Sequence, residues 1–500
     1  MTWRKIFRRT LTAIFIVAGL LTAAIVGAAV QIFEGAGQYI MSDFENHDIA
    51  KQRAQQRAEK NAQKQAGVAL KTFSRSINSE LTDEEVSAVT NNIIKVSDVK
   101  IVPVPFEAEG EAGLMYKATL KATIDTDGVY DWLKRDSKEK VTIIQQNDSL
   151  QDAIQKNDKQ IEDLKEKYKR ATSEAEKNRI RKQMTDSERD FLANQKLEEG
   201  NKLYYAKDYH GAIKIYDEVL KFGDYSEAYN NRGVAYDDLR QYERAIQDYN
   251  KAIQLDPNNA EAYNNRGNAY AKGLKQYERA IQDYNKAIQL NPNDERAYNN
   301  RGISYRNLKQ YERAIQDYDK AIQLNPNLYQ AYNNRGNAYG NLGQYERAIQ
   351  DYNKAIQLNP NYAEAYNSRG FTYYIMKKYD LAFKDANKAL QLNSNLAECY
   401  DTRGCIYLAM KNYDKALADF NKALSIMEHP VIYVNRGETY YYLKNYEKAF
   451  ADLNKAIELG LEGENLGEVL YYRGLCYQAT GNNEKAQADF AKAKQLGWNG

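Results

Sequence analysis

Apolar residues recur at spacings of three and four from about residue 193 to residue 500, and the pattern restarts about every 34 residues. In one cycle, Tyr229 to Tyr236 and Tyr242 to Ile253 each carry an apolar stripe of helical period. The Leu-Arg-Gln stretch between them is long enough only for a tight turn. The sequence therefore predicts nine helical hairpins over 193–500, numbered here as repeats 1 to 9, stacked in an α-solenoid superhelix.

Small residues occupy fixed places in every repeat. A glycine lies in each first helix, and an alanine follows in the second helix twelve residues later, or thirteen in the repeat of Gly267. Glycine inside a helix costs ~1 kcal/mol relative to alanine, so its recurrence indicates close packing. We expect the glycine and the alanine to face each other where the two helices cross. The positions are Gly200, Gly233, Gly267, Gly302, Gly336, Gly370, Gly404, Gly437 and Gly474, with Ala212, Ala245, Ala280, Ala314, Ala348, Ala382, Ala416, Ala449 and Ala486.

The order Tyr, Gly, Tyr, Ala, Tyr, Ala, Pro in these repeats, closed by Pro257, Pro292, Pro326 and Pro360, resembles the tetratricopeptide repeat family. The resemblance covers about residues 193–500. It implies a helical scaffold that holds peptides on the surface lined by its first helices. One feature departs from the family pattern, because arginine stands before the glycine where the family usually has leucine.

Two charged rows follow the repeat. An arginine precedes the glycine, and an aspartate follows it by fifteen residues, or sixteen in the repeat of Gly267. Repeat 1 lacks both, having Glu199 and Ile215, which favours pairing within one repeat. The row is either an anion-binding ladder or, as we prefer, a set of partly buried structural ion pairs. The pairs are Arg232 with Asp248, Arg266 with Asp283, Arg301 with Asp317, Arg335 with Asp351, Arg369 with Asp385, Arg403 with Asp419, Arg436 with Asp452 and Arg473 with Asp489.

Asparagines form a third row on the first helices. Side-chain amides both donate and accept, which suits them to bind the backbone of an extended peptide. The alternative is that they solvate the surface or bond between adjacent repeats. Aromatic residues, among them Phe371 and Tyr374, concentrate in repeats 6 to 9, where we expect specificity to lie. The asparagines are Asn230, Asn231, Asn264, Asn265, Asn299, Asn300, Asn333, Asn334 and Asn367.

The first 34 residues predict a cytoplasmic tip and a membrane anchor. Four basic residues, Arg4, Lys5, Arg8 and Arg9, precede an uncharged stretch from Thr10 to Phe33, long enough as a helix to cross a bilayer. The basic side is expected to stay in the cytoplasm, which places the bulk of the chain on the periplasmic side of a bacterial envelope. A cleaved signal peptide is the alternative, although the apolar stretch is longer than such peptides usually have.

Residues 36–134 predict a small α+β domain. An alanine every four residues from Ala50 to Ala66 indicates a long helix, and Thr82 with Glu85 forms a capping box that opens a second helix. Strands are expected at 99–106 and 115–124. The alanine spacing and the capping box are similar to the amino-terminal domain of flagellar assembly protein T over about 38–133, which implies a non-catalytic envelope module.

Residues 135–192 predict a helical spacer. They contain no glycine or proline, and an apolar stripe runs through Leu150, Ile154, Ile161, Leu164 and Tyr168. The stripe suits a coiled coil with a second chain, in which Asn157 sets the register. A long helix or a helical hairpin folded onto repeat 1 fits equally well.

Neither the net charge nor any motif in the sequence indicates catalysis, metal binding or nucleic-acid binding. The net charge is +2, so no global field attracts nucleic acid. The three histidines have no partners at metal-ligand spacing, no phosphate loop is present, and no carboxylate pair stands apart as catalytic. We therefore expect no enzyme, no cofactor and no metal site. The expected function is a membrane-anchored extracytoplasmic scaffold for protein or peptide partners; the alternative is a self-associating structural component of the envelope.

Overall fold

The computed structural model describes residues 32–41, 47–76, 81–108, 111–124, 126–135 and 137–498. They belong to two compact bodies, Met1–Ala269 and Tyr270–Gly500, which we call the N-terminal and C-terminal bodies. The expected anchor at 10–33 lies outside the described residues except for Ile32 and Phe33, which belong to a strand. Within the described ranges, no helix combines the length and the apolar character needed to span a bilayer.

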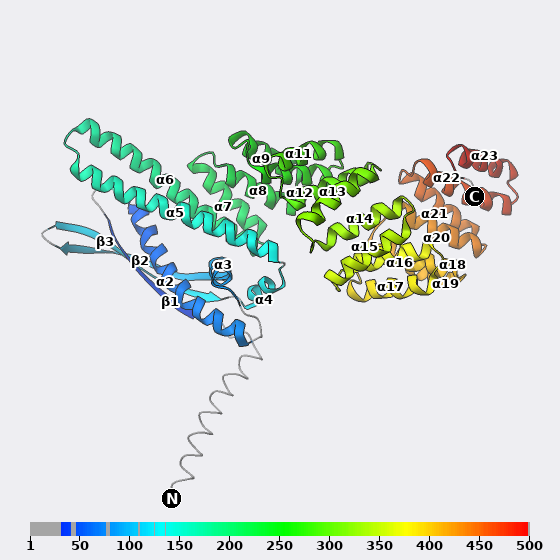
Figure 1. Ribbon diagram of the computed structural model, residues 1–500, viewed down its shortest axis with the longest axis horizontal. Helices are drawn as coiled ribbons and strands as arrows, with labels where there is room; N and C mark the ends of the chain where they lie inside the picture. Colours follow the sequence, from blue (N-terminus) through cyan, green and yellow to red (C-terminus); the bar gives the residue numbers. More distant parts are fainter. Residues whose placement is uncertain are drawn as a thin grey trace, which may run out of the picture. The chain divides into compact units, whose positions relative to one another are not determined.

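An antiparallel sheet with strand order β1-β3-β2 opens the N-terminal body (Figure 1). Its strands are β1 (Ile32–Met41), β2 (Ile94–Ala108) and β3 (Glu111–Ile124). Helix α2 (His47–Ser76) lies across the sheet and buries its alanine stripe there. A Cβ atom on Gly35 would lie 2.1 Å from the carbonyl oxygen of Ala58, and one on Gly37 would lie 2.3 Å from that of Ala54. Glycines in β1 therefore let the helix approach the sheet closely.

Helix α3 (Asp83–Ile93) begins with the expected capping box, since Thr82 and Glu85 exchange side-chain and backbone hydrogen bonds. The short helix α4 (Thr126–Lys134) follows the sheet. The spacer is a hairpin of α5 (Ser137–Arg170) and α6 (Glu174–Tyr205), which run side by side (Figure 1).

The apolar stripe of the spacer is covered by its own chain. Leu150, Ile154 and Ile161 of α5 pack with Phe191 and Leu197 of α6 and with residues of repeat 1. The hairpin alternative therefore holds, and the stripe is not available to a coiled coil with a second chain. Because α6 also contains Gly200, its carboxyl-terminal end is the first helix of repeat 1.

A polar junction around one buried arginine ties the hairpin to the sheet domain. Arg53 of α2 is 2% exposed and pairs with Asp158 at 2.8 Å and Glu162 at 3.0 Å, both on α5. Tyr39 of β1 donates to the same Glu162. Because α2 and β1 both bond to Glu162 of α5, these contacts fix the orientation of the hairpin on the sheet domain.

The repeats are helix pairs, each with a tight turn. The second helix of repeat 1 and the pairs of repeats 2 to 9 are α7 (Tyr209–Phe222), α8 (Ser226–Asp238), α9 (Tyr242–Leu255), α10 (Ala260–Asn268), α11 (Tyr277–Leu290), α12 (Glu295–Asn307), α13 (Tyr311–Leu324), α14 (Tyr329–Asn341), α15 (Tyr345–Leu358), α16 (Ala363–Ile375), α17 (Tyr379–Leu392), α18 (Ala397–Ala409), α19 (Tyr413–Ile426), α20 (Pro430–Tyr442), α21 (Tyr446–Glu458), α22 (Gly463–Ala479) and α23 (Asn483–Gln495).

One left-handed residue makes the turn inside each of the nine repeats. It is a lysine or arginine in seven of them, such as Lys309 with φ 58°, and a glycine in repeats 5 and 9, such as Gly343 with φ 72°. Left-handed backbone is unfavourable for residues with a Cβ. The repeats with lysine or arginine therefore carry a small strain that glycine relieves.

Repeat 3 accommodates one extra residue. The π-helical turn η1 (Ala269–Gly273) follows α10 directly and widens the end of the first helix. This is the insertion that lengthens the spacing after Gly267, and π turns are the usual way for a helix to absorb one added residue.

The recurring glycines lie at close helix crossings, most of them beneath an aromatic ring. In repeat 4, a Cβ on Gly302 would lie 2.7 Å from Cε1 of Tyr318, an aromatic residue of the second helix that is 0% exposed. The same holds for Gly200, Gly233, Gly336, Gly404 and Gly474, which face a tyrosine or phenylalanine ring. The expected close approach of the two helices is confirmed, since a Cβ on Gly336 would lie 3.2 Å from the carbonyl oxygen of Ala348, but in most repeats the nearest side chain is the ring sixteen residues after the glycine. The alanines are buried beside it.

Candidate functional site

The arginine row joins neighbouring repeats. In repeat 4, Nε and Nη2 of Arg301 donate to the two carboxylate oxygens of Asp317 at 2.8 and 2.6 Å, while Nη1 donates to Asn285 of the preceding repeat at 2.6 Å. Burial lowers the pKa of the Arg301 guanidinium, but the hydrogen bonds to Asp317 outweigh it, so that pKa is raised. Six further arginines make the bidentate bond to the aspartate of their own repeat: Arg232, Arg335, Arg369, Arg403, Arg436 and Arg473.

These bonds occupy both edges of the guanidinium, so the row has the geometry of structural ion pairs and not of an anion ladder. Arg266 donates to Asn250 of its own body, and Asp283 belongs to the C-terminal body, where it is buried.

The asparagines form an inter-repeat ladder. In the N-terminal body, Nδ2 of Asn265 donates to Oδ1 of Asn230 at 3.2 Å, and in the C-terminal body Nδ2 of Asn334 donates to Oδ1 of Asn299 at 3.0 Å. Thus the second asparagine of one repeat bonds to the first asparagine of the repeat before it. Within repeats 2 and 4, the first asparagine also donates to the second. The buried members are Asn230, Asn264 and Asn333. These contacts are the inter-repeat bonding that we weighed against peptide binding.

The ladder stops after repeat 5. Ser368 and Thr402 stand where repeats 6 and 7 need the second asparagine as donor. Consequently Oδ1 of Asn333 and Oδ1 of Asn367 have no hydrogen-bond partner among the described residues. Asn333 is only 4% exposed, so its acceptor is withheld from water as well. An unpaired buried acceptor costs ~1–3 kcal/mol, which makes this place unusual in the array.

Carboxylates appear on the first helices where the ladder has stopped. Asp401 lies on α18, Glu438 on α20 and Glu468 on α22. Asn435 donates to Oδ1 of Asp401 at 2.9 Å, and the hydroxyl of Tyr472 donates to Oε1 of Glu438 at 2.5 Å.

Burial dominates the titration of these carboxylates. It raises the pKa of Asp401 to about 6 and that of Glu438 to about 7, the latter with a contribution from Glu468. No lysine or arginine of the described ranges forms a salt bridge with any of the three. These groups therefore lack a countercharge, which is unusual for half-buried acids.

Aromatic rings accompany the acids. Phe371 is 44% exposed and its ring lies 6.0 Å from that of Tyr374, and Tyr442 is 46% exposed and stacks on Tyr413 at 5.7 Å. Tyr472 links the acids to the rings, because its hydroxyl donates to Glu438 and its ring lies 6.3 Å from that of Tyr441. We call this set the acidic aromatic surface; it comprises Phe371, Tyr374, Asp401, Glu438, Tyr442, Glu468 and Tyr472.

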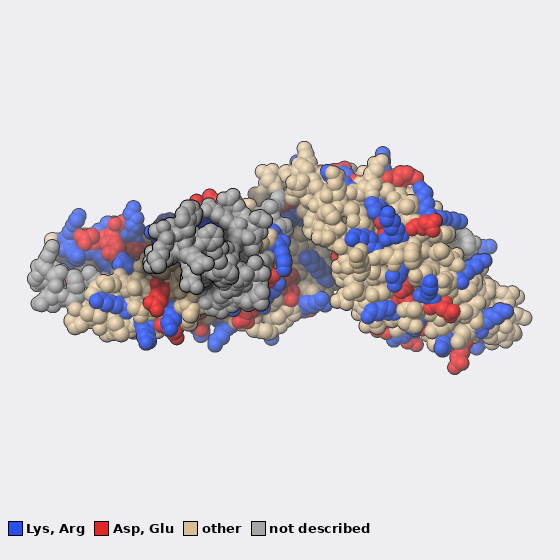
Figure 2. Space-filling model, turned by 90° about the horizontal axis from the view of Figure 1, so that it is seen from below, with Lys and Arg blue, Asp and Glu red and all other residues tan. Residues whose placement is uncertain are grey.

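Charge on this surface differs from the mixed charge elsewhere. The first helices α14, α16, α18, α20 and α22 contain no lysine, and their only cations are the arginines paired with aspartate. Figure 2 shows one face of the molecule, on which basic and acidic side chains are interspersed. The acidic aromatic surface is thus rich in acceptors and poor in cations.

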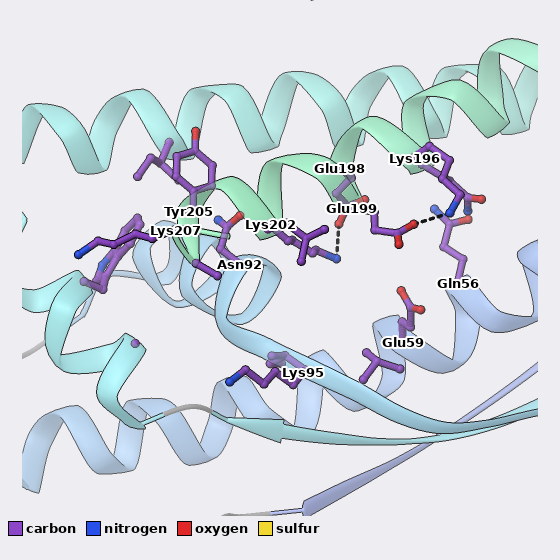
Figure 3. Close-up of a pocket in the computed structure, with 18 of the residues that line it drawn as sticks. Gln56, Glu59, Asn92, Lys95, Lys196, Glu198, Glu199, Lys202, Tyr205 and Lys207 are labelled. Atoms are coloured by element: carbon purple, nitrogen blue, oxygen red, sulfur yellow. Dashed lines mark hydrogen bonds and ion pairs between the residues drawn. The ribbon is translucent and has the colours of Figure 1, made fainter. Parts of the chain in front are cut away.

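A separate cavity of about 810 Å³ lies in the N-terminal body, lined by α2, β2 and α6 (Figure 3). Lys202 pairs with Glu198 at 2.9 Å, and Lys196 pairs with Glu199 at 2.7 Å. Its ionic groups largely satisfy one another, and no nucleophile lies beside a base. Elsewhere in the described ranges, no group of three His, Cys, Asp or Glu is arranged to hold a metal ion.

The cysteines are buried packing residues. Cys399 and Cys476 are 0% exposed and Cys405 is 7% exposed, and none forms a disulfide. Burial raises the pKa of the Cys399 thiol to about 12 and that of Cys476 to about 11. Neither thiol is a reactive nucleophile.

Stacked helical hairpins of about 34 residues define a helical-repeat protein of the α-solenoid class. Profiles described as "Tetratricopeptide repeat" match residues 226–259, 295–328, 329–362, 361–429, 430–496 and 248–282, and one described as "TPR repeat" matches 274–309. Together they cover more than half of the 500 residues. The chain belongs to the tetratricopeptide repeat family, whose members are in general protein-interaction scaffolds.

Curated relatives are similar over short segments. Sperm-associated antigen 1 of Mus musculus is 34% identical over 87 residues, which are 17% of this chain and 10% of that protein. Small glutamine-rich tetratricopeptide repeat-containing protein 2 of Mycosarcoma maydis is 38% identical over 66 residues, 13% of this chain and 19% of that protein. The chain thus spans between a tenth and a fifth of these relatives' lengths.

Solved structures of repeat proteins also resemble the chain. A tetratricopeptide repeat protein from Parabacteroides merdae is 24% identical with a TM-score of 0.39, covering 48% of this chain and 94% of its own. The pilF protein of Pseudomonas aeruginosa is 21% identical with a TM-score of 0.38, covering 42% and 96%. The resemblance of residues 38–133 to flagellar assembly protein T gains no support from these matches and stays a prediction.

The sequence reasoning named Phe371 and Tyr374 but missed Asp401, Glu438 and Glu468. It treated acids as solvated helix surface, since first helices carry several. The available signal was positional: Asp401 occupies the place of the first asparagine, and the first helices from repeat 5 onward have no lysine to balance the acids.

Proposed function

We propose that the chain is an interaction scaffold that holds an extended peptide or protein segment on the first helices of repeats 5 to 9. The observation that carries the proposal is the end of the asparagine ladder at Asn333, next to a surface with exposed rings. A backbone N–H of a bound segment is the donor that this position lacks. The amide can turn toward it because the terminal torsion of asparagine is broad.

Sequence variation between the repeats supports the same place. The second helices of repeats 2, 3 and 5 are identical, and that of repeat 4 differs at one residue. Such uniform repeats present the same side chains to a ligand, so they provide little sequence specificity. Repeats 6 to 9 differ from one another and carry Phe371 and Tyr442, the exposed aromatic type that commonly anchors interfaces.

The experiment is a selection from an unbiased library of short peptides on the full chain. Enriched peptides are synthesised, and their binding is measured by fluorescence anisotropy. Phe371→Ser should weaken binding at least tenfold, since a buried aromatic anchor contributes ~2 kcal/mol or more. Leu381→Ser is the matched control, because Leu381 is 47% exposed on the second helix α17.

The outcomes separate the two functions that the sequence left open. A selection that enriches no peptide over the bare support overturns the proposal. A concentration-dependent oligomer in light scattering, lost in Phe371→Ser, would assign the surface to a second copy of the chain and favour the structural component of the envelope.

We further propose that residues 10–31 anchor the scaffold in a membrane with its repeats outside the cytoplasm. The stretch is uncharged, follows four basic residues, and spans about 33 Å as a helix, enough for the hydrocarbon core. Carbonate extraction and protease accessibility of the full chain test this. Release of the intact chain by carbonate would contradict it.

A further inference from the structure

We infer that the segment held by the acidic aromatic surface is basic, with lysine or arginine side chains that contact Asp401, Glu438 and Glu468. This inference rests on the function proposed above and names the chemistry of the partner. Among the described residues, three features of the surface support it: carboxylates without a salt-bridge partner, nearby aromatic rings, and asparagine oxygens without a hydrogen-bond donor.

The carboxylates come at intervals, one on each of three successive first helices. Two of the three have one oxygen held by the following repeat: Asn435 donates to Oδ1 of Asp401, and Tyr472 donates to Oε1 of Glu438. The second oxygen of each remains for a ligand. Carboxylates fixed in this way are preorganised to accept an ammonium or guanidinium group.

The three carboxylates lack a positively charged partner within the part of the chain that the structure describes, which favours a positively charged ligand. Every arginine on these first helices is bound to its own aspartate, and lysine is absent from all five. Half-buried acids without a cation carry a desolvation cost. A cationic side chain of a bound segment would offset this cost by forming a salt bridge with the acids.

The aromatic residues fit the same ligand. The hydroxyl of Tyr472 donates to Glu438 at 2.5 Å, and the ring of Tyr441 lies 6.3 Å from that of Tyr472 and 5.4 Å from that of Tyr442. A cation bound at Glu438 therefore lies beside a cluster of aromatic rings, and ring faces attract lysine and arginine. The exposed ring of Phe371 adds apolar area for the stem of a long side chain.

The amide oxygen of Asn333 is independent evidence for a ligand that donates hydrogen bonds. Its Oδ1 has no partner in the described ranges, and its side chain is 96% buried, being 4% exposed. Oδ1 of Asn367, on the helix that carries Phe371, is in the same condition. A basic extended segment donates from its backbone as well as from its side chains, so it satisfies amides and acids together. A divalent metal ion is a poorer fit, because no metal-binding group of three is found in the described ranges.

The test uses three labelled peptides of one extended sequence in which the same alternate positions are lysine, glutamine or glutamate. Binding to the full chain is measured by fluorescence anisotropy at low and high salt. The lysine peptide should bind at least tenfold tighter than the glutamine peptide, and high salt should reduce the difference.

Two variants locate the effect. Glu438→Gln with Glu468→Gln should weaken the lysine peptide by roughly tenfold for each carboxylate removed, because hydrogen bonds to charged groups contribute ~1.5–3 kcal/mol. The matched control is Asp414→Asn with Glu447→Gln, which removes two exposed acids from second helices and should leave binding unchanged.

Equal binding of the glutamine or glutamate peptide, or equal loss in the control variant, would overturn the inference. The library selection distinguishes this failure from that of the proposed function. Enriched peptides that are neutral or acidic would leave peptide binding intact and refute the basic partner, whereas an empty selection would refute peptide binding itself.

Discussion

Replacing Ser368 with asparagine should extend the amide ladder by one step. In repeat 5, Nδ2 of Asn334 reaches Oδ1 of Asn299 in the preceding repeat at 3.0 Å. Ser368 holds the same place in repeat 6, and the acceptor that it leaves unpaired is Oδ1 of Asn333. Ser368→Asn therefore supplies a donor to a buried atom that has none.

The expected magnitude follows from that hydrogen bond. Serine and asparagine have similar helix propensities, so the backbone contributes little. A new intramolecular bond contributes about 1 kcal/mol to the free energy of unfolding. The reverse change, Asn334→Ser, removes a formed bond and leaves Oδ1 of Asn299 unpaired, which should cost ~1–3 kcal/mol.

Hydrogen exchange of the backbone amides in α14 and α16 is the direct assay, since it reports the local free energy of opening in an array that need not unfold in one step. Ser368→Asn should raise protection and Asn334→Ser should lower it. Ser368→Asn should also weaken peptide binding, because it occupies the acceptor of Asn333. Unchanged protection in both variants would refute the ladder as an energetic feature, and tighter peptide binding in Ser368→Asn would refute the role given to Asn333.

Three further predictions concern backbone, packing and pH. Lys309→Gly should stabilise repeat 4 by roughly 0.5–1 kcal/mol in urea unfolding, and Gly343→Lys should destabilise repeat 5 by a similar amount, because both positions have positive φ. Gly302→Ala should lower the free energy of unfolding by ~1–3 kcal/mol in urea titration, since the added Cβ overlaps the ring of Tyr318; a neutral effect would show that the ring can move. Burial raises the pKa of Glu438 to about 7, so the native state binds its proton more tightly and stability should fall as pH rises from about 4.5 to 7; a slope unchanged in Glu438→Gln would contradict this.

The repeats could be predicted because their signal is local. Each helix shows its apolar face within about fourteen residues, and nine copies of one pattern leave little freedom in the fold. The pairing of Arg301 with Asp317 also lies within one repeat, so the joint loss of both residues in repeat 1 indicated the correct partner. Strand β1 could not be predicted in this way. Its glycines have meaning only beside the alanines of α2, which come later in the sequence.

Contacts between repeats were harder to predict than contacts within them. The glycines and alanines were correctly expected to allow a close helix crossing, but the sequence does not show which side chain lies nearest the glycine, and in repeat 4 it is Tyr318. The asparagines were correctly placed on the first helices, but their bonding depends on the residue 35 positions away, as for Asn334 and Asn299. For the same reason the orphan acceptor of Asn333 becomes visible only when Ser368 is seen beside it in register.

The π turn η1 has a consequence for how such arrays change over evolutionary time. One residue added to an ordinary α-helix rotates everything that follows by about 100°, since a full turn takes 3.6 residues. Here the surplus is absorbed between Ala269 and Gly273, and α11 begins with the same Tyr-Glu-Arg-Ala sequence as its counterparts. The added residue is thus taken up within a single turn of helix, and the second helix of repeat 3 keeps the length and sequence of its counterpart in repeat 5.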